Sequence, residues 1–148
     1  MQLLLELAAA TAMVAATVTT HLAGLAALLA LLRRHRQGRP DRRGLIAEGL
    51  AIVAAAAGLF VLHGIEIWAY AALYLGVGAV GNLETALYFS TASYTTVGYG
   101  DVVLDPRWRV VGAIESANGI ILLGWSTAFF VSIVGRIRWL EAEAQELS

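Results

Sequence analysis

The segment 95–101 reads Thr-Thr-Val-Gly-Tyr-Gly-Asp, with glycine at every second position in its second half. Gly98 and Gly100 can adopt positive φ without a Cβ penalty, which allows successive carbonyls to point to one side. A row of carbonyl oxygens, repeated around a symmetry axis, can replace the hydration shell of a monovalent cation. The hydroxyl of Thr96 would add an oxygen below that row. The segment therefore predicts an ion-coordinating backbone loop.

The composition is that of a membrane protein. Of 148 residues, 59% are hydrophobic and 14% are charged, and the net charge is −1. There is no cysteine, which excludes disulfides, thiolate metal sites and cysteine nucleophiles. The basic residues are not interleaved with aromatic ones, so nucleic-acid binding is not indicated.

Three apolar segments are long enough to cross a bilayer. We expect an N-terminal span within residues 1–32, chiefly 7–32, and then a basic loop at 33–44. A pore unit follows at 45–136, with an outer helix from 45 to about 70 and a returning helix at 110–134. Between them, the chain after about residue 70 either leaves the apolar core or bends near Gly76, Gly78 and Gly81. Residues 137–148 form a short helical tail. Its apolar positions either close a small bundle or leave a solvated amphipathic end: Ile137, Leu140, Ala144 and Leu147.

The charge layout predicts the orientation. All ten basic residues are arginine, and six of them lie in the segment 33–43. By the positive-inside rule this loop and the tail are cytoplasmic and the N-terminus is outside, in a multi-pass protein of the cell (inner) membrane. Topology alone accounts for the arginines, and an anionic-lipid contact is the alternative reading for Arg33, Arg34 and Arg36.

The segment 82–94 is too short to span the membrane. Asn82 is a good N-cap and Glu84 lies in the first turn. We expect a re-entrant helix that enters from outside and directs its partially negative C-terminal end at the ion path. Such irregular backbone at membrane depth needs protein around it.

Four ionisable residues lie inside the predicted spans. His21 either packs against another helix or senses protons. His63 and Glu66, three residues apart on one helix face, form either a polar clamp against the pore region or a pH sensor, near the outer boundary of the bilayer. Glu115 is expected behind the loop, bonded to pore-helix hydroxyls or to His63, because an unpaired carboxylate there is costly.

The sequence Thr-Val-Gly-Tyr-Gly at 96–100 resembles the selectivity filter of potassium channels, and the resemblance extends over residues 45–138. It is similar in particular to small bacterial three-span members of the two-transmembrane, pore-loop superfamily. The resemblance implies potassium ions as the bound species and no organic cofactor. It implies ion coordination by Thr96, Val97, Gly98, Tyr99 and Gly100.

The resemblance also implies a set of supporting residues. Asp101 would bond a pore-helix residue, and Tyr88 stands where family members often have tryptophan, while Ala92 stands where some have glutamate. The returning helix would bend at Gly119 or Gly124. Helical spacing adds candidates for the lining of an inner cavity: Ile120, Leu123, Thr127 and Val131. The expected filter supports are Tyr88, Thr95, Asp101, Glu115, His63 and Glu66.

One chain contributes one loop, so a pore lined on all sides implies a homotetramer with fourfold symmetry. The function predicted is passive, potassium-selective conduction in an all-α membrane protein of three transmembrane helices, a re-entrant pore helix and a filter loop. The alternatives are a nonselective cation channel, or a non-conducting sensor or assembly protein that uses the same fold. No enzyme is predicted, because no nucleophile, base or metal ligands stand at recognisable spacing.

Overall fold

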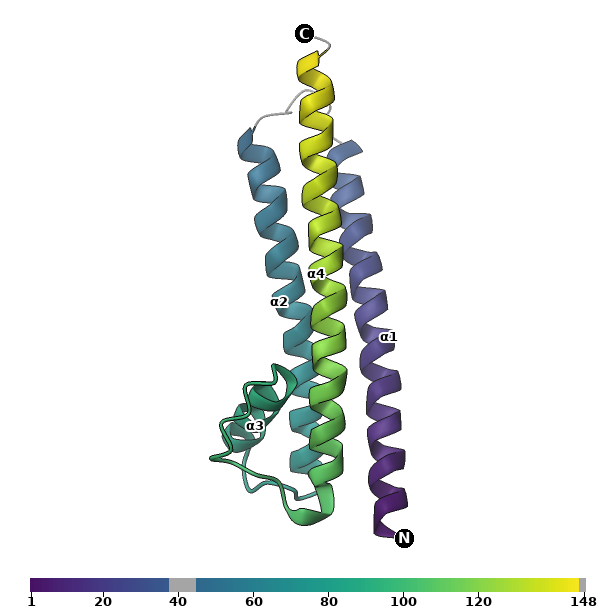
Figure 1. Cartoon of the computed structure of the whole chain (residues 1–148), viewed down its shortest axis with the longest axis vertical. Coiled ribbons are helices and arrows are strands. Elements are labelled where there is room, and N and C mark those ends of the chain that lie inside the picture. The colour runs from purple at the N-terminus through teal and green to yellow at the C-terminus, as the bar shows by residue number, and fades with distance from the viewer. Residues whose placement is uncertain (38–44, 147–148) are drawn as a thin grey trace.

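The computed structural model describes residues 1–37 and 45–146, with side chains for 1–34 and 46–135. Every regular element in these ranges is helical: α1 (Gln2–Gln37), α2 (Leu45–Gly76), α3 (Leu83–Tyr94), the 3₁₀ turn η1 (Pro106–Trp108) and α4 (Arg109–Glu146). Figure 1 shows three long helices side by side and the short α3 at one end of them. Within the described ranges, three helices are long and apolar enough to cross a membrane. The fold is therefore that of an all-helical membrane protein.

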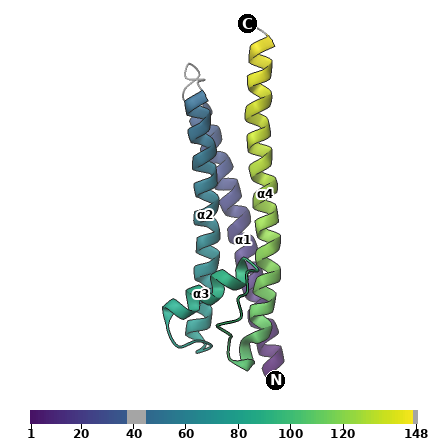
Figure 2. The same ribbon diagram turned by 60° about the vertical axis from the view of Figure 1, so that its left-hand side comes forward.

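The long helices alternate in direction. In Figures 1 and 2, α1 and α4 run from the end that holds the N-terminus and α3 toward the end that holds the C-terminus, and α2 runs the opposite way. The extended segment between α3 and α4 lies at the same end as the N-terminus. The loop predicted to bind ions and the chain's beginning thus share one end of the bundle.

Each long helix is longer than the sequence predicts. α1 runs through the first part of the expected loop to Gln37, because arginine and glutamine are good helix formers. Gly38 and Pro40, the expected breakers, lie outside the described residues. α2 continues past residue 70 to Gly76, where the glycines begin. α4 does not end near 134 but runs unbroken to Glu146, so the tail continues it. The side chains of the expected tail bundle lie outside the described residues.

The start of α3 is as predicted. Asn82 is its N-cap, with an extended backbone (φ −155°, ψ 166°), and its side-chain oxygen accepts a hydrogen bond from the backbone N–H of Thr85 at 2.8 Å. This bond satisfies one of the N–H groups that a helix leaves free at its start. The cap thereby separates α3 from α2 and sets the direction in which α3 crosses the bundle end.

The interior of the bundle is polar as well as apolar. Each long helix buries one stripe at helical spacing, and the stripes face one another. The stripe of α1 holds Glu6, Ala10, Thr17 and His21; that of α2 holds Leu59, Leu62, Glu66, Tyr70 and Tyr74; that of α4 holds Val111, Glu115, Asn118, Leu122 and Ser126. Because lipid cannot satisfy polar groups, these side chains turn inward, and Thr17, His21, Glu66, Tyr70, Tyr74, Glu115, Asn118 and Ser126 bond across the helices.

Glycines bring α1 against α2. A Cβ added at Gly24 would lie 2.5 Å from a methyl of Leu62, and one at Gly58 would lie 2.3 Å from a methyl of Leu28. Small residues of this kind let membrane helices approach closely. The two contacts hold the first helix tightly on the remainder of the bundle.

Candidate functional site

The loop after α3 has alternating backbone conformations. Thr96, Gly98 and Gly100 have φ of 60°, 51° and 78°, while the residues between them do not have positive φ. The glycines behave as predicted, and Thr96 joins them although it carries a Cβ. A reversal at every second residue is the geometry that turns successive carbonyls to one side. The side chains of Val97 and Tyr99 are exposed, at 51% and 75%.

Three backbone hydrogen bonds fasten this loop to the end of α3. Thr95 N–H donates to Thr91 O at 3.1 Å, Thr96 N–H donates to Ser93 O at 2.9 Å, and Gly98 N–H donates to Ala92 O at 3.0 Å. The last carbonyls of a helix lack hydrogen-bond donors within the helix. These bonds give a donor to three such carbonyls. The start of the loop is therefore held to α3 by main-chain hydrogen bonds.

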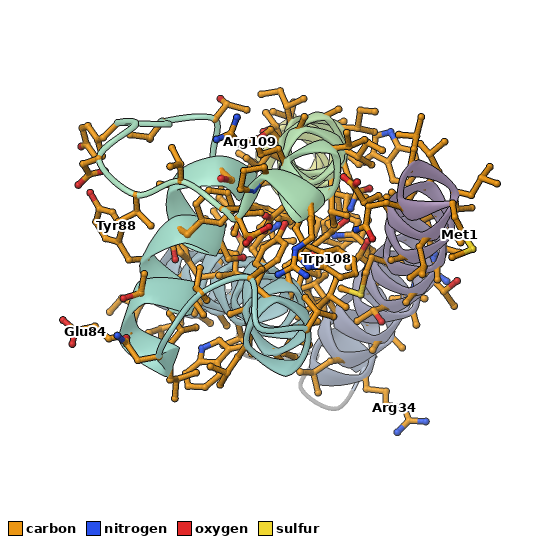
Figure 3. The ribbon with its side chains drawn as sticks, turned by 90° about the horizontal axis from the view of Figure 1, so that it is seen from below. Met1, Arg34, Glu84, Tyr88, Trp108 and Arg109 are labelled. Atoms are coloured by element: carbon orange, nitrogen blue, oxygen red, sulfur yellow. The ribbon has the colours of Figure 1, made fainter. Side chains whose placement is uncertain are left out.

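A side-chain bond closes the far end of the loop. The hydroxyl of Tyr88 in α3 donates to Asp101 Oδ2 at 2.7 Å, and the backbone N–H of Val102 donates to Asp101 Oδ1 at 3.1 Å. The Tyr88 hydrogen bond holds the pKa of Asp101 below its usual range. Figure 3 shows Tyr88 on the α3 side of the molecule, opposite α1. Tyrosine therefore reaches the aspartate, as the resemblance to the filter family requires of this position.

Behind α3, Glu115 is fully buried. Ser90 Oγ donates to its Oε1 at 2.5 Å and Tyr74 OH donates to its Oε2 at 2.7 Å, and Ser90 also contacts Ile67 O at 2.9 Å. Of the two partners expected from the sequence, the pore-helix hydroxyl is present, and no bond to His63 is found among the described side chains. Glu115 thus joins α2, α3 and α4 behind the loop.

A second polar cluster lies farther along the helices. His21 Nδ1 is 2.9 Å from Glu66 Oε1, His63 Nδ1 is 3.2 Å from Glu66 Oε2, and the hydroxyl of Tyr94 donates to Glu66 Oε2. Ser126 Oγ lies 2.9 Å from His63 Nε2 and 3.4 Å from His21 Nε2. The contact predicted between His63 and Glu66 is present, and His21 packs between helices as expected. The cluster joins all four α-helices.

Between the two clusters, Asn118 bridges α4 to the other long helices. Its Nδ2 donates to Thr17 Oγ1 at 2.7 Å and to Tyr70 OH at 3.3 Å. The polar interior therefore runs almost continuously along α4, from Glu115 through Asn118 to Ser126. Each member has a partner from another helix.

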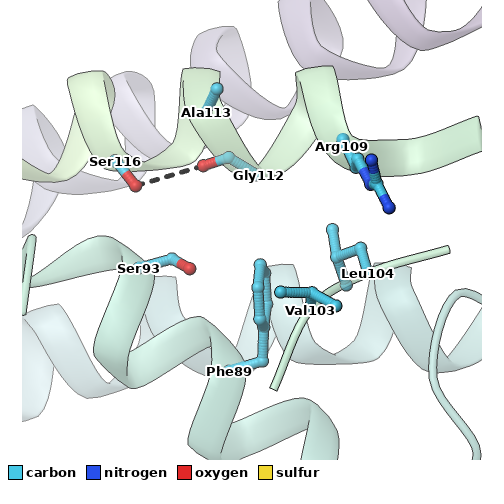
Figure 4. A pocket seen from close by; sticks show the side chains of 8 residues that line it. All are labelled: Phe89, Ser93, Val103, Leu104, Arg109, Gly112, Ala113 and Ser116. Carbon is cyan, nitrogen blue, oxygen red and sulfur yellow. Dashed lines mark hydrogen bonds between the residues drawn. The ribbon is translucent and has the colours of Figure 1, made fainter. Parts of the chain in front are cut away.

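An open pocket of about 520 Å³ lies where α3 diverges from α4. Figure 4 shows Phe89 between the two helices, with Arg109 at one end and Ser93 and Ser116 at the other. Ser116 Oγ bonds Gly112 O at 3.2 Å in its own helix. The lining comprises Phe89, Ser93, Val103, Leu104, Arg109, Gly112, Ala113 and Ser116.

The two hinge candidates of α4 differ sharply. A Cβ at Gly119 would lie 2.1 Å from Tyr94 O, so this glycine is a point of close helix packing, whereas a Cβ at Gly124 would meet nothing within 4 Å. The helix is unbroken at both. Of the cavity candidates, Ile120, Thr127 and Val131 are exposed and Leu123 packs on the core. Arg33 and Arg34 are exposed, and the side chain of Arg36 lies outside the described residues.

The sequence did not predict the hydrogen bonds of Tyr70, Tyr74 and Tyr94. A signal was present in α2. Its polar residues His63, Glu66, Tyr70 and Tyr74 recur at intervals of three or four, which places them on one helix face. Which residues of other helices meet that face could not be read from the spacing.

The fold and the loop together define a membrane protein with an ion-channel pore unit. Residues 50–136, more than half of the chain, match the family described as "Ion channel". The chain belongs to this family. It is also similar to the calcium-gated potassium channel TvoK of Thermoplasma volcanium, with 42% identity over 60 residues. That match covers 40% of this chain and 17% of the relative. No solved structure matches.

Proposed function

We propose that four copies of this chain form a potassium-selective channel with residues 96–100 as its filter. The observation that carries the proposal is the alternating positive φ of Thr96, Gly98 and Gly100 within a Thr-Val-Gly-Tyr-Gly sequence. This is the backbone that a carbonyl-lined ion path needs. The family match supports an ion channel, and the similarity to a calcium-gated potassium channel supports potassium as the conducted ion.

In this mechanism the protein supplies oxygens in place of water. Carbonyls of Thr96, Val97, Gly98 and Tyr99 coordinate the dehydrated ion, Gly100 ends the row, and the Thr96 hydroxyl adds the innermost oxygens. A single chain presents its carbonyls on one side only. Fourfold symmetry closes the ring around the ion, which makes the homotetramer part of the proposal.

The remaining architecture fits a re-entrant arrangement. α3 would enter from the outer face, and the loop would return to that face beside the N-terminus, at the end that Figure 1 shows at the bottom. The basic segment 33–43 would then lie on the cytoplasmic side of the cell (inner) membrane, as the positive-inside rule requires. Anionic lipid contact at Arg33, Arg34 and Arg36 is part of the same proposal.

The exposed apolar side chains agree with an assembly in lipid. Phe60 is 82% exposed, Trp68 56%, Ile120 52% and Val131 64%. In a lone chain in water, apolar surface of this extent is costly. Bilayer would cover part of it, and neighbouring copies in the tetramer would cover another part.

The test is ion flux in vesicles reconstituted with the purified chain. We expect potassium flux that barium blocks, with no comparable sodium flux. Equal potassium and sodium fluxes would reject selectivity and favour a nonselective pore. A well-folded tetramer that carries neither ion would reject conduction and favour a sensor or assembly role.

A further inference from the structure

Two imidazoles and a carboxylate converge inside the bundle. His21 of α1, and His63 and Glu66 of α2, offer ligand atoms that all lie within 4.8 Å of one another. His21 and Glu66 have side chains with no exposed surface, while that of His63 is 12% exposed and provides a route of entry. Imidazole and carboxylate are the ligands that Zn²⁺ takes in many of its sites. The set is therefore a candidate metal site by ligand type.

The hydrogen bonds of this cluster have fewer hydrogens than contacts. Six contacts need a hydrogen: His21 with Glu66, His63 with Glu66 and with Tyr94, Tyr94 with Glu66, and Ser126 with each imidazole. Neutral imidazoles carry one hydrogen each, and the tyrosine and serine hydroxyls carry one each, which makes four. With Glu66 ionised, six contacts thus share four hydrogens, and the cluster keeps a net negative charge in the interior.

A divalent metal ion would resolve this shortage. Bound to Nδ1 of both imidazoles and to the carboxylate, it replaces the hydrogens that those contacts need. Each imidazole then carries its hydrogen on Nε2, and both Nε2 atoms already face Ser126 Oγ. A hydroxyl oxygen has two lone pairs and can accept both bonds. Metal-bound histidines typically donate their second N–H to such an acceptor, which fixes the tautomer.

We propose that His21, His63 and Glu66 bind one divalent transition-metal ion of the Zn²⁺ class per chain. Tyr94 OH or a water is the fourth ligand, and Ser126 orients both imidazoles. The site joins α1, all of which precedes the family match at 50–136, to Tyr94, the last residue of α3 before the filter loop. Metal binding thereby fastens the first helix to the base of that loop.

The experiment measures metal binding by the purified full-length chain in detergent, with Zn²⁺ and with Co²⁺ as an optical probe. We expect one Zn²⁺ per chain, and visible Co²⁺ absorption of tetrahedral type that Zn²⁺ abolishes by competition. This readout needs no conduction, so it succeeds or fails separately from the proposed channel function. If the chain binds no Zn²⁺ and Co²⁺ gives no such absorption, the proposal is wrong.

Variants separate this site from nonspecific binding. His21→Ala should abolish the Co²⁺ absorption, and Ser126→Ala should weaken Zn²⁺ binding about 10- to 100-fold, the usual effect of removing an outer-sphere partner. His35→Ala is the matched control, because residue 35 lies fourteen positions farther along α1, roughly 21 Å from His21, and it should change nothing. Glu66→Gln keeps the side-chain volume and should also lose binding. Unchanged binding in both His21→Ala and Glu66→Gln would overturn the assignment.

Discussion

Gly119 of α4 lies directly against the backbone of Tyr94, the last residue of α3. A Cβ at position 119 would be 2.1 Å from the Tyr94 carbonyl oxygen and 3.0 Å from its Cα. Backbone atoms cannot move aside as a flexible side chain can. The end of α3 can therefore lie here only because position 119 of α4 has no side chain. The start of the loop at residues 95–101 depends on the same contact.

This contact predicts that Gly119→Ala destabilises the protein by about 1–3 kcal/mol, as overpacking usually does. Gly124→Ala is the matched control in the same helix, since its Cβ would meet nothing within 4 Å. The control should be neutral or slightly stabilising, because alanine has the higher helix propensity. Thermal unfolding of both variants in detergent checks the pair. Equal stability of the two variants would show that α4 does not pack on Tyr94 in this way.

Gly98→Ala should abolish potassium flux. Gly98 has φ of +51°, and in this region a Cβ costs about 1–2 kcal/mol and crowds the carbonyl that must turn. The control is Gly49→Ala in α2, where an added Cβ meets nothing within 4 Å. Flux assays on reconstituted vesicles compare the two variants. Wild-type potassium flux through Gly98→Ala would contradict the filter assignment.

Tyr88→Phe should raise the pKa of Asp101 toward the ordinary aspartate value of about 3.9. In the wild type the Tyr88 hydrogen bond lowers this pKa. The bond therefore contributes fully above pH about 3.9 and is lost as pH falls through the lower, folded-state value. Carbon NMR of labelled aspartate, with Asp105 as an internal reference, follows the titration. Asp105 is held by Arg107 and should titrate unchanged.

Glu115→Gln should alter open probability or tetramer stability more than ion selectivity. Ser90 and Tyr74 both donate to this carboxylate, and the amide offers only one acceptor oxygen, so one hydroxyl must rotate. Glu115→Ala should be more severe, because the buried Tyr74 hydroxyl loses this partner at about 1–3 kcal/mol and Ser90 keeps only Ile67 O. Unfolding and the potassium-to-sodium flux ratio are the two measurements. Lost selectivity with wild-type stability would contradict a supporting role.

The sequence alone was enough to predict the main helices and the unusual backbone of the loop after α3. Hydropathy identified three long apolar helices, Asn82 marked the start of α3, and the alternating glycines predicted positive φ at Gly98 and Gly100. These features depend on local chemistry: apolar length, a capping side chain, and the absence of a Cβ. The predicted ends of the long helices were less accurate. An arginine-rich stretch outside the apolar core can continue a helix, because arginine is a good helix former.

Only the tertiary structure decided which polar groups meet. Spacing placed His63 and Glu66 on one face, but their partners Tyr94, His21 and Ser126 come from three other helices. Likewise, the sequence offered Glu115 two kinds of partner, and helix packing selected Ser90 and Tyr74. Contacts between helices depend on their rotation and axial shift, which are set jointly by all the packed faces. A single helix's periodicity predicts which face is buried, but not which residues of another helix lie against it.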